Sequence, residues 1–123
     1  SGMPYEEFLA KKIFEPLGMK DTTFRPSDEQ LKRLATLYGK GEGDEGLTPT
    51  KHWINDPEET KTRGPNPSGG LFSTATDMAK FYQMVLNGVE LDGERIVSEE
   101  AFEEMTRVQT DGLKTGFTDG NGW

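Results

Sequence analysis

The sequence predicts a mainly α-helical, loop-rich protein segment with one small β-hairpin. Capping residues stand before apolar residues at helical spacing, and a single Asp-Gly turn separates two short runs that suit strands. In addition, 15 glycines and 7 prolines interrupt the chain, and only 32% of residues are hydrophobic. A soluble domain usually has roughly 45–50%. We therefore interpret the chain as a loop-rich domain or a piece of a larger protein.

Two helices are predicted in the N-terminal third. The first begins at Pro4, which suits a first helical turn, and ends near Pro16. The second is short and begins near Asp28, because Ser27 and Gln30 fit a capping box. The apolar stripe of the first helix comprises Tyr5, Phe8, Leu9 and Ile13.

Residues 39–67 are predicted to form one long surface loop. The run GKGEGDEG within it has no apolar side chain to bury, and an irregular segment rich in proline and threonine follows. A loop of this length is uncommon in an independent compact domain. It again indicates that neighbouring parts of a larger protein are missing from this segment.

A third helix is predicted to begin after a cap provided by Ser73 or Thr74, with Thr74 and Asp77 as the capping box. Asn87 and Gly88 end it. We expect Phe81, Val85 and Leu86 of its stripe to pack on the stripe of the first helix that includes Phe8, Leu9 and Ile13, because neither apolar face is stable in water. The stripe of the third helix comprises Met78, Phe81, Tyr82, Val85 and Leu86.

The segment VELDGERIV is predicted to be the hairpin, with its turn at Asp92 and Gly93. Ser98 then caps a fourth helix. The apolar side chains of this helix are Phe102, Met105 and Val108.

Composition excludes several classes of function. The formal charge of −8 opposes a role in nucleic-acid binding, which needs clustered basic residues. No run approaches the ~20 apolar residues of a membrane span. The chain has no cysteine and a single histidine, His52, so we expect no metal site and no cofactor. Asp119 and Asn121 lack the distal glutamate of a calcium loop and are interpreted as a solvated turn.

Three blocks in order, YEEFLAKKIFEPLGMKDTTF, SGGLFSTATDMAKFYQMVLNG and ERIVSEEAFEEMTRVQT, carry a family resemblance. Together they resemble the serine β-lactamase-like family, which includes class C β-lactamases, DD-peptidases and related esterases. The resemblance spans Pro4 to Thr110. It implies that residues 1–123 are a single partial domain, an internal fragment of a larger serine hydrolase, and a helical, loop-rich portion of the α/β β-lactamase/transpeptidase-like fold.

The resemblance also implies acyl transfer by a serine in Ser-x-x-Lys, assisted by Tyr-x-Asn and a later Lys-Thr-Gly or His-x-Gly strand. None of the five serines here has a lysine three residues later, and no tyrosine has an asparagine two residues later. We therefore expect no catalytic residue in this chain and no activity from it alone.

Two strings imitate catalytic motifs. Lys114, Thr115 and Gly116 spell Lys-Thr-Gly, but no strand pattern surrounds them, so we interpret them as a coincidence on a loop. Ser73 follows a glycine pair, yet Gly-x-Ser-x-Gly is not met. Helix capping is the better interpretation of this serine.

By the resemblance, Ser68, Gly69 and Gly70 border the substrate pocket, and Gly69 stands where class C β-lactamases place a bulky aromatic residue. A glycine there would widen the pocket and favour an ester or peptide acyl group over a tightly held lactam. A turn that needs positive φ before a cap explains each glycine equally well. Both interpretations stay open.

The full-length protein is expected to act on a small-molecule ester, amide or lactam, and the resemblance implies a periplasmic or secreted location. The N-terminus shows no signal-peptide pattern. The competing hypothesis is a free-standing helical interaction module without catalysis. In either case, an unpartnered helix face would let the isolated segment dimerise.

Overall fold

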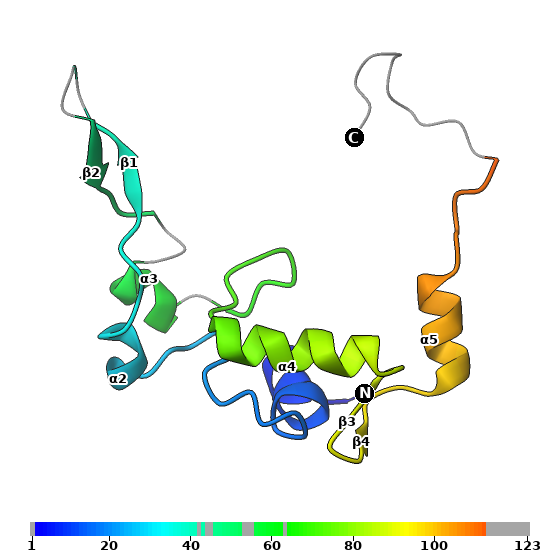
Figure 1. Ribbon diagram of the computed structural model, residues 1–123. Helices are drawn as coiled ribbons and strands as arrows, with labels where there is room; N and C mark the ends of the chain where they lie inside the picture. The colour runs from blue at the N-terminus through cyan, green and yellow to red at the C-terminus, as the bar shows by residue number, and fades with distance from the viewer. Residues whose placement is uncertain (1, 42, 44–45, 53–55, 63, 113–123) are drawn as a thin grey trace.

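The computed structural model describes residues 2–41, 43, 46–52, 56–62 and 64–112. Figure 1 shows short helices and two small hairpins arranged around one longer helix. In chain order the elements are α1 (Tyr5–Leu9), the π-helical turn η1 (Ala10–Phe14), α2 (Asp28–Leu31), β1 (Tyr38–Lys40), β2 (Leu47–Pro49), α3 (Pro57–Thr62), α4 (Ala75–Leu86), β3 (Glu90–Leu91), β4 (Glu94–Arg95) and α5 (Glu99–Thr106). The mainly helical class predicted for this segment is confirmed.

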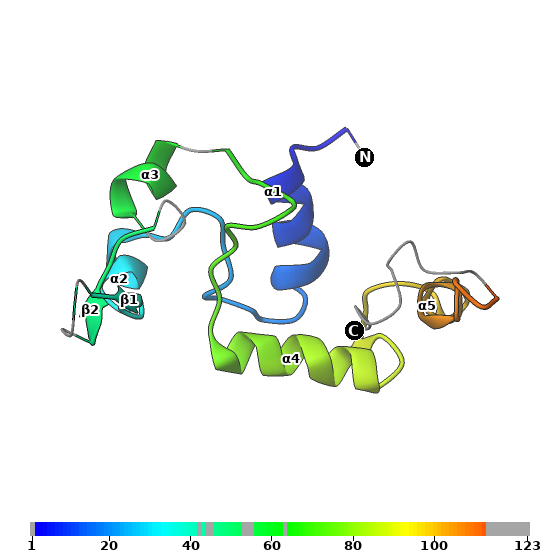
Figure 2. The same cartoon turned by 90° about the horizontal axis from the view of Figure 1, so that it is seen from above.

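The first predicted helix is present as α1 followed directly by η1. Its second half is wider than an α-helix, since the N–H of Glu15 donates to the carbonyl oxygen of Ala10, five residues back. Gly18, with φ +61°, lies in the turn that follows. Seen from above, this helix stands across α4 with its C-terminal end toward it (Figure 2).

The core lies where η1 and its following loop meet α4 and β3. Leu17, Met19, Met84 and Val89 are buried there. The partly buried side chains around them are Ile13, Phe14, Phe81, Val85, Leu91, Ile96, Val97 and Phe102. Ile13 of the first helix and Phe81 and Val85 of the third thus pack on one cluster, as predicted, whereas Phe8 and Leu9 lie outside it.

The predicted stripe of α4 is wider than the surface that covers it. Leu86 is 81% exposed and Tyr82 is 59% exposed, so the prediction that Leu86 packs on the first helix is wrong. Met84, which was not assigned to the stripe, is buried instead. Apolar residues lie on more than one side of α4, and the side facing Leu17 and Met19 is the one that the described residues cover with the core.

The predicted hairpin is confirmed. Strand β3 pairs antiparallel with β4 in the register Glu90 to Arg95 and Leu91 to Glu94. Asp92 and Gly93 have φ of +51° and +87°, the left-handed values that a two-residue hairpin turn requires.

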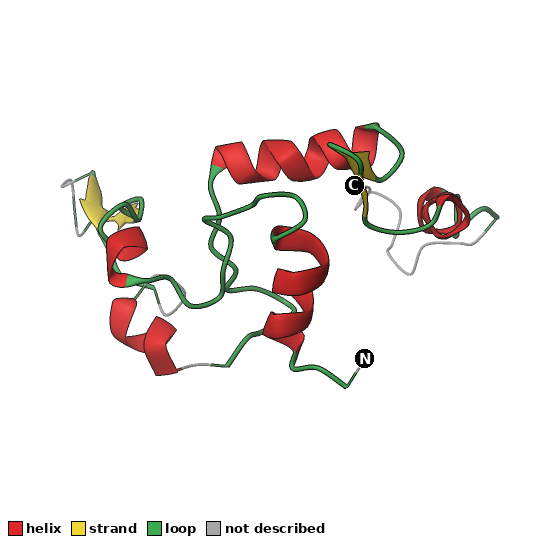
Figure 3. Cartoon of the chain, turned by 90° about the horizontal axis from the view of Figure 1, so that it is seen from below, coloured by secondary structure: helices red, strands yellow, loops and turns green. Residues whose placement is uncertain are grey.

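The prediction of one irregular loop over 39–67 is wrong. Strand β1 pairs antiparallel with β2, and α3 follows within the same segment. This hairpin projects at the opposite end of the molecule from α5 (Figure 3). Tyr38 and Leu47 are exposed. The strands are therefore held by main-chain pairing and carry no apolar alternation that a sequence pattern could reveal.

Caps form at the starts of α4 and α5, and the cap of α4 is Thr74, so the interpretation of Ser73 as a helix cap is wrong. The Thr74 side chain accepts from the N–H of Asp77, and the Ser98 side chain accepts from the N–H of Ala101. No helix in the described part of the chain is long and apolar enough to cross a membrane.

Candidate functional site

Ser68 lies in a tight turn that its own neighbours stabilise. The Oδ1 atom of Asn66 accepts hydrogen bonds from the backbone N–H of Ser68 at 3.0 Å and from its hydroxyl at 2.9 Å. The N–H of Gly69 donates to the carbonyl oxygen of Asn66 at 3.1 Å. The turn is exposed at Ser68 and becomes buried at Gly70.

The two glycines of this turn differ in conformation. Gly70 has φ +91°, which residues with a Cβ rarely adopt. Gly69 does not lie in the left-handed region, and a Cβ added to it would meet no atom within 4 Å. The requirement for positive φ therefore applies to Gly70, whereas Gly69 has room for a side chain.

The chain leaving this turn attaches to the loop after the first helix. Phe72 and Thr23 exchange two main-chain hydrogen bonds, of 3.0 and 2.8 Å. The hydroxyls of Ser73 and Thr22 are 2.8 Å apart. The segment that follows residues 68–70 is thus attached to the two threonines of that loop.

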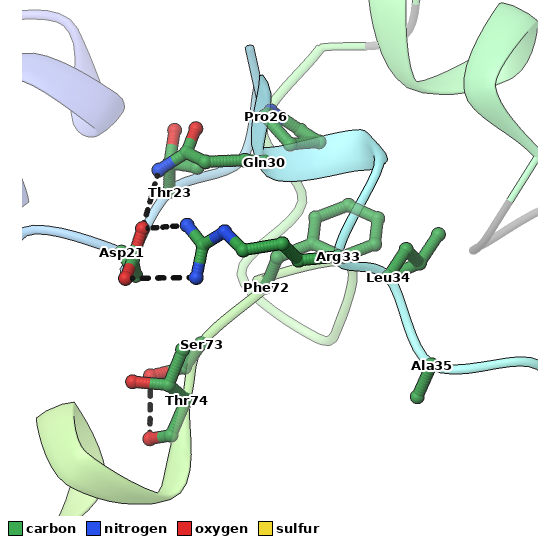
Figure 4. A pocket seen from close by; sticks show the side chains of 10 residues that line it. All are labelled: Asp21, Thr23, Pro26, Gln30, Arg33, Leu34, Ala35, Phe72, Ser73 and Thr74. Atoms are coloured by element: carbon green, nitrogen blue, oxygen red, sulfur yellow. Dashed lines mark hydrogen bonds and ion pairs between the residues drawn. The ribbon is translucent and has the colours of Figure 1, made fainter. Parts of the chain in front are cut away.

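A cavity of about 190 Å³ opens where these two segments meet α2. Figure 4 shows its lining residues, which come from the loop, from α2 and the residues after it, and from the segment leading into α4. They are Asp21, Thr23, Pro26, Gln30, Arg33, Leu34, Ala35, Phe72, Ser73 and Thr74. Ser68, Gly69 and Gly70 do not line it. The predicted pocket residues therefore lie just before the segment that forms one wall of this cavity.

An ion pair occupies one side of the cavity. The guanidinium of Arg33 donates to both carboxylate oxygens of Asp21, through Nη1 at 3.2 Å and through Nη2. Gln30 adds a hydrogen bond of 3.3 Å to the same carboxylate (Figure 4). The hydrogen bonds from Arg33 and then Gln30 lower the pKa of Asp21, and the bond to Asp21 raises the pKa of Arg33. The pair is a charge-assisted, bidentate contact that fixes α2 to the loop.

Sequence patterns did not reveal this pair, because twelve residues separate Asp21 from Arg33. Gln30 was assigned only to the capping box. It does serve there, since its Oε1 accepts from the N–H of Ser27 at 2.8 Å, while its Nε2 bonds to Asp21.

Other candidate residues contribute little to this site. His52 is exposed. Among the described residues, no three side chains of His, Asp or Glu gather closely enough to hold a metal ion. The Lys114-Thr115-Gly116 string and the Asp119 and Asn121 turn lie outside the described residues.

Comparison with known proteins identifies the family. A family model described as Beta-lactamase matches residues 1–123. The chain belongs to the beta-lactamase family. The resemblance noted in the three sequence blocks is confirmed.

Relatives in the beta-lactamase family come from several organisms. Protein Rv1367c of Mycobacterium tuberculosis is 33% identical over 103 residues, which are 83% of this chain and 25% of that protein. The D-alanyl-D-alanine-carboxypeptidase/endopeptidase AmpH of Escherichia coli is 34% identical over 71% of this chain and 19% of its own length. Beta-lactamase-like protein 4 of Dictyostelium discoideum is 35% identical over 72% of this chain and 14% of its own length.

A solved structure shares the fold of this beta-lactamase-family segment. The octameric penicillin-binding protein homologue from Pyrococcus abyssi is 34% identical, with a TM-score of 0.58, over 85% of this chain and 20% of that chain. The chain thus spans a quarter or less of the length of these relatives.

Proposed function

We propose that this chain is an internal segment of a serine hydrolase that cleaves a β-lactam, a D-alanyl peptide or an ester through an acyl-enzyme. The match of the beta-lactamase family model to all 123 residues carries this proposal. The relative AmpH, a D-alanyl-D-alanine carboxypeptidase and endopeptidase, supports acyl transfer at an amide as one of the reactions. The proposal includes a periplasmic or secreted location.

The nucleophile and its base come from outside these residues. A serine hydroxyl attacks a carbonyl only when a neighbouring base takes its proton. Ser73 has the Thr22 hydroxyl as its close side-chain partner, and Ser68 has the Asn66 amide oxygen. Neither partner is a base, and no serine here starts a Ser-x-x-Lys motif. The segment alone is therefore inactive in this proposal.

The segment contributes the edge of the substrate pocket at Ser68, Gly69 and Gly70. The open space around the Cβ position of Gly69 supports a pocket that is wide at this point. A wide edge suits an ester or peptide acyl group better than a tightly held lactam.

A free-standing interaction module is the second candidate, because Tyr82, Leu86, Met105 and Val108 are exposed on or next to α4 and α5. These side chains are also what a segment cut from a larger hydrolase would expose. The octameric state of the Pyrococcus abyssi homologue is compatible with association of such surfaces, including a dimer of the isolated segment.

Hydrolysis assays separate the two candidates. The full-length protein should hydrolyse nitrocefin, a p-nitrophenyl ester or a D-alanyl-D-alanine peptide, and residues 1–123 alone should hydrolyse none of them. The reading frame should contain Ser-x-x-Lys upstream and His-x-Gly or Lys-Thr-Gly downstream. A start near Ser1 with a stop near Trp123 would support the interaction module instead.

A further inference from the structure

A carboxylate is buried in the first turn of α4. Asp77 is only 4% exposed, although aspartate is almost never buried unless it is paired. Its N–H is bonded to the Thr74 cap, but its carboxylate does not complete the predicted capping box. Instead, Oδ2 accepts from the backbone N–H of Asp21 at 2.7 Å and from the hydroxyl of Thr22 at 3.0 Å.

Lys80, one turn further along α4, strengthens the same attachment. Its ammonium donates to the carbonyl oxygen of Gly18 and lies 3.6 Å from Oδ1 of Asp77. Two side chains of α4 therefore hold the loop from Gly18 to Thr22 at three points.

The direction of the hydroxyl bonds follows from proton counting. A threonine hydroxyl has one proton, and that of Thr22 donates to Asp77. In the 2.8 Å contact between Thr22 and Ser73, the proton must therefore come from Ser73. Ser73 is thus linked to Asp77 through Thr22, and its hydroxyl also lies 3.5 Å from the carbonyl oxygen of Thr74.

Both sides of the cavity depend on the same loop. The backbone of Asp21 is held by Asp77, while its side chain holds Arg33 of the α2 region. Thr23, two residues on, pairs with Phe72, which leads back to the Ser68 to Gly70 turn. A shift of the loop relative to α4 would move both walls and the turn together.

We propose that Asp77 is a positioning residue that sets the Ser68 to Gly70 pocket edge by clamping the loop at Asp21 and Thr22 to α4. The hydrogen bonds from Asp21 and Thr22 to Asp77 are the evidence for this clamp. Its consequence for substrate binding rests on the proposed hydrolase function.

Asp77→Asn tests the clamp with almost no change in shape. Both loop bonds end on one carboxylate oxygen, Oδ2, while Oδ1 faces Lys80. An amide that kept its oxygen at the Oδ2 position would be an uncharged, weaker acceptor and would place its NH2 group against the Lys80 ammonium. In the full-length protein, hydrogen exchange at the amides of Asp21 and Phe72 should become about 10-fold faster, the effect of weakening these buried, charge-assisted hydrogen bonds. Asp92→Asn, in the exposed β3–β4 turn where asparagine suits the positive φ, is the matched control and should change neither amide.

Thr22→Val provides a second variant, because it removes only the hydroxyl that links Asp77 to Ser73. It should also speed exchange at Phe72, even if Asp77→Asn fails to fold. Unchanged exchange at Phe72 in the folded variants would overturn the proposal. A uniform acceleration along the chain would also overturn it, because that indicates general destabilisation rather than a local clamp.

Steady-state kinetics on the full-length protein test the consequence for substrate. Asp77→Asn and Thr22→Val should each raise KM about 10-fold, with kcat changed less, because the pocket edge moves while the nucleophile stays in place. A lowered melting temperature with unchanged KM and kcat would reduce Asp77 to a structural role. An inactive wild-type protein would refute the proposed function alone, and the exchange data would still decide the clamp.

Discussion

Replacing Gly69 and Gly70 separately with alanine should have opposite effects on stability. Gly70 has φ +91°, so an alanine there is strained by about 1–3 kcal/mol. Gly69 lies outside the left-handed region and has free space for a Cβ. Alanine at Gly69 should therefore stabilise by about 0.4–1 kcal/mol, because it restricts the unfolded chain. The two variants should differ by about 1–4 kcal/mol in free energy of unfolding.

Denaturant unfolding of the two variants measures this difference directly, provided that the slope with denaturant is the same in both. If Gly69→Ala unfolds at a lower denaturant concentration than Gly70→Ala, the turn does not require positive φ at Gly70 and the reasoning is refuted.

The pocket role is tested by Gly69→Tyr in the full-length protein. This variant should keep its stability and lose activity on bulky acyl groups more than on small ones, because the ring narrows the proposed pocket edge.

Three further predictions concern the core, the ion pair and a helix cap. Met84→Ala should cost about 2–5 kcal/mol in denaturant unfolding because Met84 is buried, whereas Leu86→Ala in the isolated chain should stay within about 0.5 kcal/mol of wild type. The lowered pKa of Asp21 means that its ionised form stabilises the fold above its unfolded pKa, and this contribution is lost as pH falls through the folded pKa. Arg33→Met should return the Asp21 pKa, followed by NMR, toward 3.8 and flatten the acid limb of the stability profile. Thr74→Ala should cost about 1 kcal/mol of stability, because the N–H of Asp77 loses its acceptor.

Local sequence patterns correctly predicted where the capped helices begin and where the β3–β4 hairpin turns. Capping depends on residues only a few positions apart, so Ser27, Thr74 and Ser98 were found without knowledge of the fold. The Asp92-Gly93 turn was predictable for the same reason, since the left-handed φ values it needs favour these two residues. Each of these features depends only on residues that are close together in the sequence.

Features that depend on distant partners were predictable only in part. An apolar stripe shows that α4 has neighbours, but it does not show which of Met84 and Leu86 faces them. The β1–β2 hairpin is held by main-chain bonds that leave no side-chain pattern. The same limit applies to the site. Sequence spacing marked the glycine pair, but only the backbone angles separate Gly69 from Gly70, and only the folded loop brings Asp77 to Thr22.

The central claim is that this beta-lactamase-family chain is a pocket-forming segment whose nucleophile lies elsewhere in the protein. Treating the full-length protein with a fluorophosphonate or a penicillin and locating the adduct by mass spectrometry tests it most directly. The claim predicts a single labelled serine, in a Ser-x-x-Lys motif outside these 123 residues, and no label on residues 1–123 treated alone. An adduct on Ser68 or Ser73 would contradict it.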